Sequence, residues 1–437
     1  MPPRRWTAAA ARARHYHRPV LRLAVALFAA QAGFHGFTAS LPVALARAGF
    51  GDAEIGFVVG TAALVQMPAA LVAGMAIDRF GGLRLFVAGA AAYALGALIV
   101  LAAGVEASTP LAILLSVRLL QGIGIAIVIP AALALVPALV APQRQGFGLA
   151  FMGSAHNLTM GVLPPISLAI LAAWTMRGVA AFVLVSIAVG VVLAVGIAGR
   201  LAASARVGSG KGGATIAGIT APPAVRRFGL LYRASWTSPL VLTVLFAAHW
   251  GAIVAFLPQR AEAAGADIGL FFAADAFAIF ASRVPTGWLA DRVPTRWLLL
   301  VGVVITIAAL ALLLPRPTTE LLVLSGIGTG IGGGFVVSPL LLEFARRSGP
   351  AERGSAFALF SVAFAAALSI GSIGGAPLVE RAGFEITLVV GMVGLALAGI
   401  LAAADRSMRP RRGPLEPHEA LVGPAVDSPG MVELPPG

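Results

Sequence analysis

The chain has 437 residues, of which 59% are hydrophobic and only 11% are charged, and its formal net charge is +13. Soluble domains carry about 25% charged residues, so this composition excludes an ordinary soluble protein and indicates an integral membrane protein. Cysteine is absent, which excludes disulfides, thiolate catalysis and thiolate metal sites. We expect no metal and no cofactor.

Twelve apolar segments follow one another along the chain, and a helix of roughly 20 residues suffices to cross a bilayer. The first six lie near 20–46, 54–77, 84–104, 110–140, 146–172 and 178–201, and the last six near 237–260, 268–290, 296–315, 318–345, 354–377 and 384–404. We predict five regions: an uncleaved cytoplasmic arm (1–19), a six-helix bundle (20–202), a cytoplasmic linker (203–236), a second six-helix bundle (237–404) and a disordered cytoplasmic tail (405–437). The end of the linker, 226–233, mixes basic and apolar residues and favours a short segment on the membrane surface.

The basic residues are distributed unevenly between the two sides that these spans define. The side that holds both termini carries 24 of the 31 Lys and Arg residues, and the opposite side carries five. Basic loops stay in the cytoplasm, so we expect both termini to be cytoplasmic in a multi-pass plasma (inner) membrane protein. The net charge is then a topology signal, and we expect no nucleic-acid partner.

The two halves of the sequence repeat one another. The stretch Gly74–Gly81 ends the second apolar segment, and the similar stretch Gly287–Pro294 ends the eighth; Asp78 and Asp291 lie 213 residues apart. A repeat of half the chain length in an apolar sequence indicates two copies of one bundle, related by an axis along the membrane normal.

These residues carry a family resemblance. The turn Gly74…Asp78-Arg79-Phe80-Gly81…Arg84 resembles the signature of the major facilitator superfamily between helices two and three, and Arg118…Gln121-Gly122 resembles its helix-four motif. The resemblance implies an all-α membrane fold of twelve helices in two pseudo-symmetric six-helix bundles, and it favours bacterial efflux-type members. The stretch Gly161–Ser167 lacks the Gly-Pro-x-x-Gly-Gly motif of the antiporter subgroup, so uptake also stays open.

The resemblance further implies a gate at the two repeated turns. A carboxylate beside guanidinium groups can hold helix ends together in one conformation and release them in another. The gating candidates are Asp78, Arg79, Arg84, Asp291 and Arg292. The alternative is that these are solvated turns whose charges only set the topology.

Two ionisable residues inside spans are candidates for proton coupling. Arg118 lies within the fourth span, where an Arg costs about 3 kcal/mol on insertion scales; the alternative is a side chain that snorkels to the surface. Asp275 is the one carboxylate well inside a span, and loss of water favours its protonated form; the alternative is a structural hydrogen bond to another helix. We expect no direct salt bridge between Arg283 and Asp275; Glu343 is instead within reach of Arg283.

Polar side chains also lie on spans that line the central cavity in the family. We predict a cavity for a small solute lined by Gln31, His35, Arg118, Gln121, His156, Asn157, His249 and Trp250. The alternative is interhelical hydrogen bonding, which is common in membrane proteins. The Gly-rich run 326–334 lacks the strand and the lysine of a nucleotide loop and predicts close helix packing.

The chain is therefore predicted to be a secondary active transporter rather than an enzyme. It would move a small organic solute by alternating access, coupled to protons, with efflux favoured over uptake. A proton-coupled uptake symporter of a small organic or anionic solute is one alternative, and a non-transporting sensor or lipid-handling relative is another. The expected partners are the solute, protons and the bilayer, and we expect a monomer.

Overall fold

The computed structural model describes residues 19–140, 145–199, 233–290, 292–348 and 353–405, and every regular element in this part of the chain is a helix. The predicted arm, linker and tail, including the surface segment 226–233, fall almost wholly outside the described residues. Ten of the described helices are long and apolar enough to cross a membrane, and Thr295–Ala311 is a shorter apolar helix.

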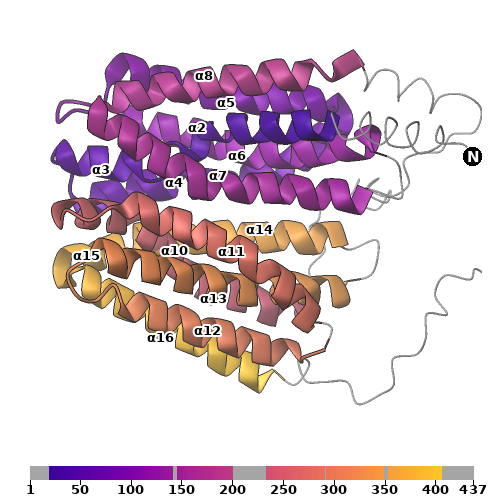
Figure 1. Ribbon diagram of the computed structural model, residues 1–437, viewed down its shortest axis with the longest axis vertical. Helices are drawn as coiled ribbons and strands as arrows, with labels where there is room; N and C mark the ends of the chain where they lie inside the picture. Colours follow the sequence, from indigo (N-terminus) through magenta and orange to yellow (C-terminus); the bar gives the residue numbers. More distant parts are fainter. Residues whose placement is uncertain (1–18, 141–144, 200–232, 291, 349–352, 406–437) are drawn as a thin grey trace, which may run out of the picture.

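The N-terminal half consists of six membrane-spanning helices, which run side by side (Figure 1). They are the bent first helix Pro19–Arg47, which includes α2 (Ala32–His35) and α3 (Ser40–Arg47), followed by α4 (Asp52–Phe80), α5 (Gly82–Ala103), α6 (Leu111–Leu139), α7 (Gln145–Ala173) and α8 (Met176–Val195). The bend falls where Gly33 packs directly against the ring of Tyr93 and where the Ser40 hydroxyl donates to the Gly36 carbonyl at 2.7 Å.

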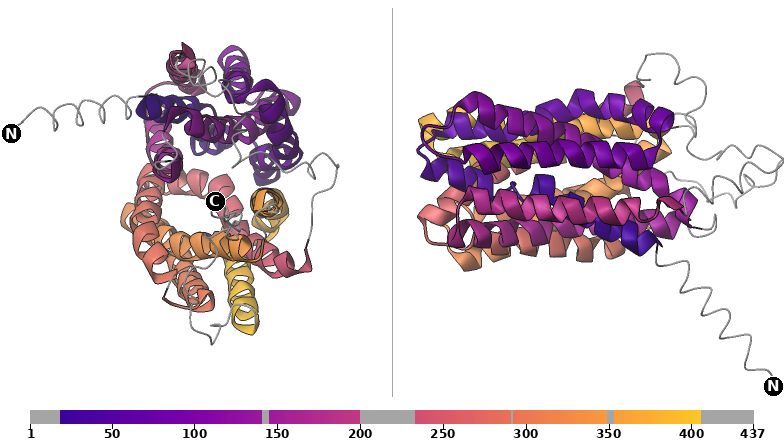
Figure 2. Two further views of the ribbon diagram at one scale, coloured as in Figure 1. Left: turned by 90° about the vertical axis from the view of Figure 1, so that its right-hand side faces the viewer. Right: turned by 90° about the horizontal axis from the view of Figure 1, so that it is seen from above.

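The C-terminal half repeats this arrangement. Its elements are η3 (Ala234–Trp236), α10 (Thr237–Ala263), α11 (Ile268–Ala290), α12 (Thr295–Ala311), α13 (Thr319–Arg346), α14 (Arg353–Ser369), the π-helical turn η4 (Ile370–Gly374), α15 (Ala376–Ala382) and α16 (Phe384–Ala404). Viewed along the helix axes, the two halves form separate groups of helices side by side (Figure 2). The predicted fold of two six-helix bundles is confirmed, and most span edges agree within a few residues.

The eleventh span departs from the prediction of one helix over 354–377. It breaks into α14, η4 and α15, and the glycines of this segment explain the break. Gly371 lies so close to α10 that a Cβ would overlap the Ala248 carbonyl, and Gly251 of α10 meets the Leu368 carbonyl in the same way. A π-turn re-aims the backbone at such a close approach, and apolar periodicity does not record it.

Helix α13 packs tightly against two neighbours through its Gly-rich run. A Cβ on Gly326, Gly330 or Gly334 would overlap α11, and one on Gly328 or Gly332 would overlap α12. The expectation that this run serves close helix packing is confirmed, since small residues let helix backbones approach in a bilayer.

The hydrogen bonds and ion pairs that join the halves among the described residues lie toward one end of the molecule. We call the end that holds residues 19 and 404 the terminal end, on the right in Figure 1, and the opposite end the far end. At the far end Arg47 pairs with Glu262, Gln259 donates to Asp52 at 2.5 Å, and the Ala53 amide donates to Glu380 at 2.9 Å. We call these three contacts the far-end latch. Deeper in the bundle the Ser369 hydroxyl donates to the Gly60 carbonyl at 3.3 Å.

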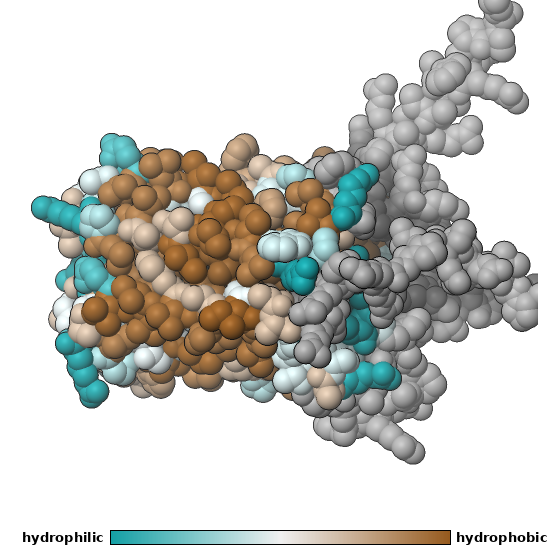
Figure 3. Space-filling view, turned by 90° about the horizontal axis from the view of Figure 1, so that it is seen from below, coloured by the Kyte–Doolittle hydropathy of each residue, from teal (hydrophilic) through white to brown (hydrophobic). Residues whose placement is uncertain are grey.

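The surface shown in Figure 3 has an apolar band between hydrophilic groups at the two ends. Many large apolar side chains of the described residues are exposed, among them Val304 and Ile400. Exposed apolar surface of this extent suits contact with lipid acyl chains.

Candidate functional site

A buried polar network lies in the N-terminal half, where the first helix meets α5 and α7. The Tyr93 hydroxyl donates to Gln31 Oε1 at 3.0 Å, and Gln31 Nε2 contacts His156 Nδ1 at 3.1 Å. The rings of His35 and His156 lie 5.6 Å apart between centroids. His35 Nε2 is buried without a hydrogen-bond partner among the described residues. The structure thus brings together three of the residues predicted to line a cavity.

Arg118 is fully inside the bundle, with 4% of its surface exposed. Its guanidinium donates to the carbonyls of Val58 at 3.1 Å and Val59 at 2.7 Å on α4 and to Gln121 Oε1 at 2.6 Å. It also lies over the ring of Phe34 at 5.4 Å. The Arg118 side chain does not snorkel to the surface. Its positive charge is stabilised by the two backbone carbonyls, by the Gln121 amide oxygen and by the face of the Phe34 ring.

Asp275 is equally buried, at 3% exposure, and lies between two helices of the C-terminal half. The Thr329 hydroxyl of α13 donates to its Oδ1 at 2.8 Å. The interhelical hydrogen bond that we considered as the alternative is therefore present, and a proton-binding role is compatible with it.

Arg283 does not lie where the sequence placed it. Glu343 instead accepts from Thr295 at 2.7 Å and from Arg347 at 3.1 Å, and it lies 3.6 Å from Arg346. Arg283 is an exposed side chain of α11. The expectation that Arg283 would reach Glu343 is wrong, because Arg346 and Arg347, three and four residues along the chain, already pair with the Glu343 carboxylate.

The remaining cavity candidates are dispersed. His249 Nδ1 contacts the Phe246 carbonyl at 2.5 Å, and its Cβ lies against Gly391 of α16, on the outer side of α10. Trp250 stacks on Phe271 at 6.1 Å between ring centroids. The structure therefore separates these two residues from the network of the N-terminal half.

The gate candidates lie at the terminal end. Arg79 and Arg84 are exposed, and Arg79 lies over the ring of Phe80 at 5.3 Å. Arg292 is also exposed. The side chain of Asp78 and the whole of Asp291 lie outside the described residues, so the gate stays a prediction.

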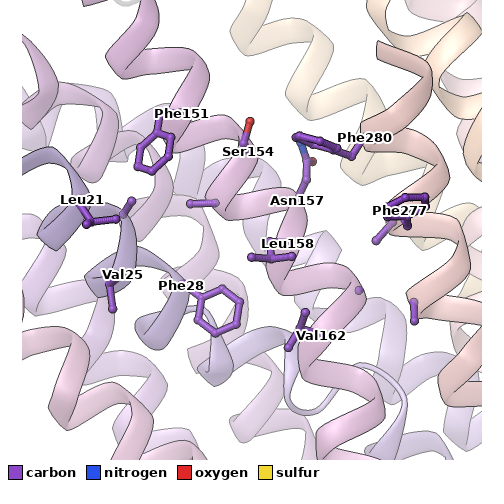
Figure 4. Close-up of a pocket in the computed structure, with 15 residues that line it drawn as sticks. Leu21, Val25, Phe28, Phe151, Ser154, Asn157, Leu158, Val162, Phe277 and Phe280 are labelled. Atoms are coloured by element: carbon purple, nitrogen blue, oxygen red, sulfur yellow. The ribbon is translucent and has the colours of Figure 1, made fainter. Parts of the chain in front are cut away.

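An apolar groove of about 860 Å³ opens between the first helix, α7 and α11. Figure 4 shows Leu158 of α7 between Phe28 of the first helix and Phe277 of α11. Phe277 is 75% exposed. Because Leu158 follows His156 by two residues, about 200° of helix rotation separates the groove from the polar network. Asn157 lines the groove together with Ser154.

Several polar contacts escaped the sequence analysis. Tyr93 and Thr329 each bind a predicted site residue, and both lie in apolar runs where a single hydroxyl gives no periodic signal. A polar cluster at the terminal end was also missed. In it Arg347 contacts Asp405 at 3.5 Å, and the Ser238 hydroxyl donates to Asp405 at 2.7 Å. Arg47 of the far-end latch was counted only for the topology, and Asp52, Glu262 and Glu380 were given no role.

Two apolar six-helix bundles that are joined at one end and enclose buried polar side chains define a polytopic membrane protein of the transporter class. The chain belongs to the Major Facilitator Superfamily, whose sequence profile matches residues 23–267 and 240–429. Membership makes it a secondary transporter and not an enzyme.

Solved structures share the fold at low sequence identity. A POT family transporter in complex with 5-aminolevulinic acid superposes with a TM-score of 0.70 at 14% identity, over 90% of this chain and 97% of that one. A mutant of a peptide transporter POT in complex with alafosfalin gives 0.67 at 17% identity, over 88% and 95%. The nucleoside transporter NupG gives 0.63 at 16% identity, over 89% and 98%. No curated protein matches the sequence.

Proposed function

We propose that the chain is a proton-coupled transporter that exports a small organic solute across the plasma (inner) membrane by alternating access, with both termini in the cytoplasm. The observation that carries the proposal is the position of the latch. The polar contacts described between the halves lie in the far-end half of the molecule. Such a state, closed on one side, is one of the two that a rocking mechanism requires.

Orientation follows from charge. The predicted topology assigns most of the Lys and Arg residues of the sequence to the side of both termini, and the positive-inside rule assigns that side to the cytoplasm. In this orientation the described conformation is closed toward the outside. The turns with Asp78, Arg79, Arg84, Asp291 and Arg292 would then close the cytoplasmic side in the opposite state.

Solute binding is assigned to the buried polar residues of the N-terminal half, Gln31, His35, Arg118, Gln121 and His156. Asn157 lines the neighbouring groove, whereas His249 and Trp250 lie apart from this network. Arg118 favours a solute with an anionic group, because no carboxylate among the described residues neutralises it. Its anchoring bonds leave two of the five guanidinium N–H groups for a solute.

Asp275 is proposed to carry the coupling proton. Its carboxyl group is out of contact with water and is held by one hydroxyl, so it can exist in the neutral form. Arg118 is the second coupling candidate, since a proton or an anionic group near it changes the same local charge.

The test is transport by the purified protein in liposomes with an imposed pH gradient. We would screen nucleosides, dipeptides, 5-aminolevulinic acid and the cationic dye ethidium, and follow internal pH with pyranine. A solute that moves outward against an inward proton flow supports export, whereas co-directional movement identifies the uptake symporter. Absence of any solute-dependent flux across a broad panel favours the sensor or lipid-handling alternative.

The variant Asp275→Asn mimics the neutral carboxyl group and sharpens the test. We expect proton-driven net flux to be lost and solute exchange at equal pH to continue. Unchanged proton-driven flux in this variant would remove Asp275 from the coupling role.

A further inference from the structure

The apolar groove between the first helix, α7 and α11 has walls from both halves of the molecule. Apart from Ser154 and Asn157, no residue that lines it carries a polar side chain. Its volume of about 860 Å³ lies within the range of about 300–1,000 Å³ that is typical of ligand pockets. Apolar surface favours contact with hydrocarbon over contact with water, so a hydrocarbon chain is the ligand that fits the groove.

The groove is open to the bilayer and has the length of one leaflet. Helices α7 and α11 lie side by side on the near face of the molecule in Figure 1, and Leu158, Phe277 and Phe280 of the groove are exposed. Along α7 the groove extends from Phe151 to Val162, which is about 16 Å of helix. Half of the hydrocarbon core of a bilayer is about 15 Å thick. The groove therefore matches an acyl chain that belongs to a single leaflet.

The groove lies in the leaflet at the terminal end. In Figure 4 Leu21, Phe151 and Phe280 lie at one end of the groove and Val162 at the other. Leu21 is two residues from the start of the first helix at Pro19, so the end with Leu21 is the terminal end, and the end with Val162 lies deeper in the membrane. In the proposed orientation this leaflet is the cytoplasmic one.

Arg283 lies just beyond the groove on the terminal-end side. It follows the lining residues Ala276 and Phe280 by seven and three residues, which places it on the same side of α11, about 5 Å nearer the terminal end than Phe280. The side chain is exposed. Among the described residues, no carboxylate forms an ion pair with it. Arg283 is thus an unneutralised cation at the mouth of an apolar groove.

An arginine in this position requires an anionic partner. It lies seven residues before the end of α11 at Ala290, about 10 Å inside the helix, where a charge is costly unless it is paired or reaches the headgroup layer. A guanidinium group binds phosphate through two parallel hydrogen bonds. Arg22, which is exposed and adjacent to the lining residue Leu21, adds a second positive charge near the same end. Basic pockets between membrane helices bind anionic lipid headgroups.

We propose that the groove binds an anionic phospholipid of the leaflet at the terminal end, with one acyl chain along α7 and the phosphate on Arg283. The site is separate from the buried polar network to which solute binding is assigned. Because α7 belongs to the N-terminal half and α11 to the C-terminal half, the bound lipid contacts both. The proposal goes beyond the proposed function and depends on neither the solute nor the direction of transport.

The first test measures the headgroup preference of the full-length protein. The purified protein is titrated in detergent with phosphatidylglycerol or with phosphatidylcholine of identical acyl chains, and native mass spectrometry counts the bound lipid. We expect the parent protein to bind phosphatidylglycerol about fivefold or more tightly than phosphatidylcholine, and Arg283→Gln to lose this preference.

Arg296→Gln is the matched control for the headgroup. Arg296 lies near the same end of the molecule on α12, and no residue of α12 lines the groove, so this variant should bind both lipids as the parent protein does. A preference that persists in Arg283→Gln overturns the proposal. A preference that is lost equally in Arg296→Gln, or that is absent from the parent protein, overturns it as well.

A second variant tests the acyl chain and leaves Arg283 in place. Leu158→Trp fills the middle of the groove from an exposed position, and we expect it to weaken the binding of phosphatidylglycerol about fivefold or more. Leu98→Trp is its control, since Leu98 is also exposed but lies on α5 outside the groove. Unchanged binding in Leu158→Trp, in a protein with the parent melting temperature, would contradict the placement of the acyl chain.

A competition experiment distinguishes a lipid from a soluble anion. Glycerol 3-phosphate, which carries the phosphate without the acyl chains, should leave the bound phosphatidylglycerol in place at equal concentration. Displacement by this probe would show that the site recognises a soluble phosphate and would refute the lipid. The binding data also stand apart from transport: liposomes without any solute flux refute the proposed function and leave this site intact, whereas parent-like lipid binding in Arg283→Gln refutes the site alone.

Discussion

The far-end latch offers a direct way to move the protein from one conformation to the other. In the triple variant Asp52→Ala, Glu262→Ala and Glu380→Ala, the three polar contacts that join the halves at the far end are removed together. We expect the equilibrium to shift toward a conformation that is open at that end.

The magnitude follows from the exposure of the groups. Arg47 and Glu262 have 48% and 34% of their side chains exposed, so solvent limits this pair to about 0.5 kcal/mol. The partly buried bond from Gln259 to Asp52 contributes about 1 kcal/mol and the exposed bond to Glu380 about half of that. Together they amount to about 2 kcal/mol, which is roughly a 30-fold change in the population ratio. Glu262→Ala alone should change it roughly twofold.

Spin labels at Trp174→Cys, after the end of α7, and at Leu270→Cys, near the start of α11, report the distance across the far end. Both positions are exposed. The control is Glu106→Ala: Glu106 pairs with Arg177 at 3.1 Å near the same end but within one half, so its loss should leave the distance distribution unchanged. A triple variant that is folded and has the parent distribution would refute the assignment of these contacts as a latch. An equal shift in the control would do the same.

Two further predictions concern buried groups. Arg118→Met should keep or raise the melting temperature, because an apolar side chain of similar length replaces a buried charge. The same variant should abolish transport. A fluorescence melting curve measures the first effect and liposome flux the second, and retained transport would contradict a functional role for Arg118. Gly371→Ala should destabilise the fold by about 1–3 kcal/mol through overpacking against Ala248, whereas Gly153→Ala, which meets no neighbouring atom within 4 Å, should leave the melting temperature unchanged.

The fold could be predicted from the sequence because the bilayer imposes its strongest constraint on each helix separately, through residues that are consecutive in the chain. A spanning helix must satisfy its backbone internally and present apolar side chains over a fixed length, and both requirements appear as uninterrupted runs such as Phe384–Ala404. The break at Ile370–Gly374 was missed because it arises from a neighbour, α10, and not from local polarity.

The residues of the candidate site also divide into those that the sequence marks and those that it does not. Gln31, His35 and His156 were identified because polar residues in apolar spans are conspicuous, and the structure places them together. His249 has the same local signal but lies on the other side of its helix, toward α16. Tyr93 and Thr329 gain their roles only from residues far along the chain, so no local pattern marks them.

The glycines of α13 that pack against α11 and α12 affect how these three helices move relative to one another. At Gly326 and Gly330 the backbone of α13 lies directly against the backbone of α11, and at Gly332 it lies directly against the backbone of α12. A displacement of α11 should therefore be passed on to α13 and α12, so that the three helices move together as one rigid unit.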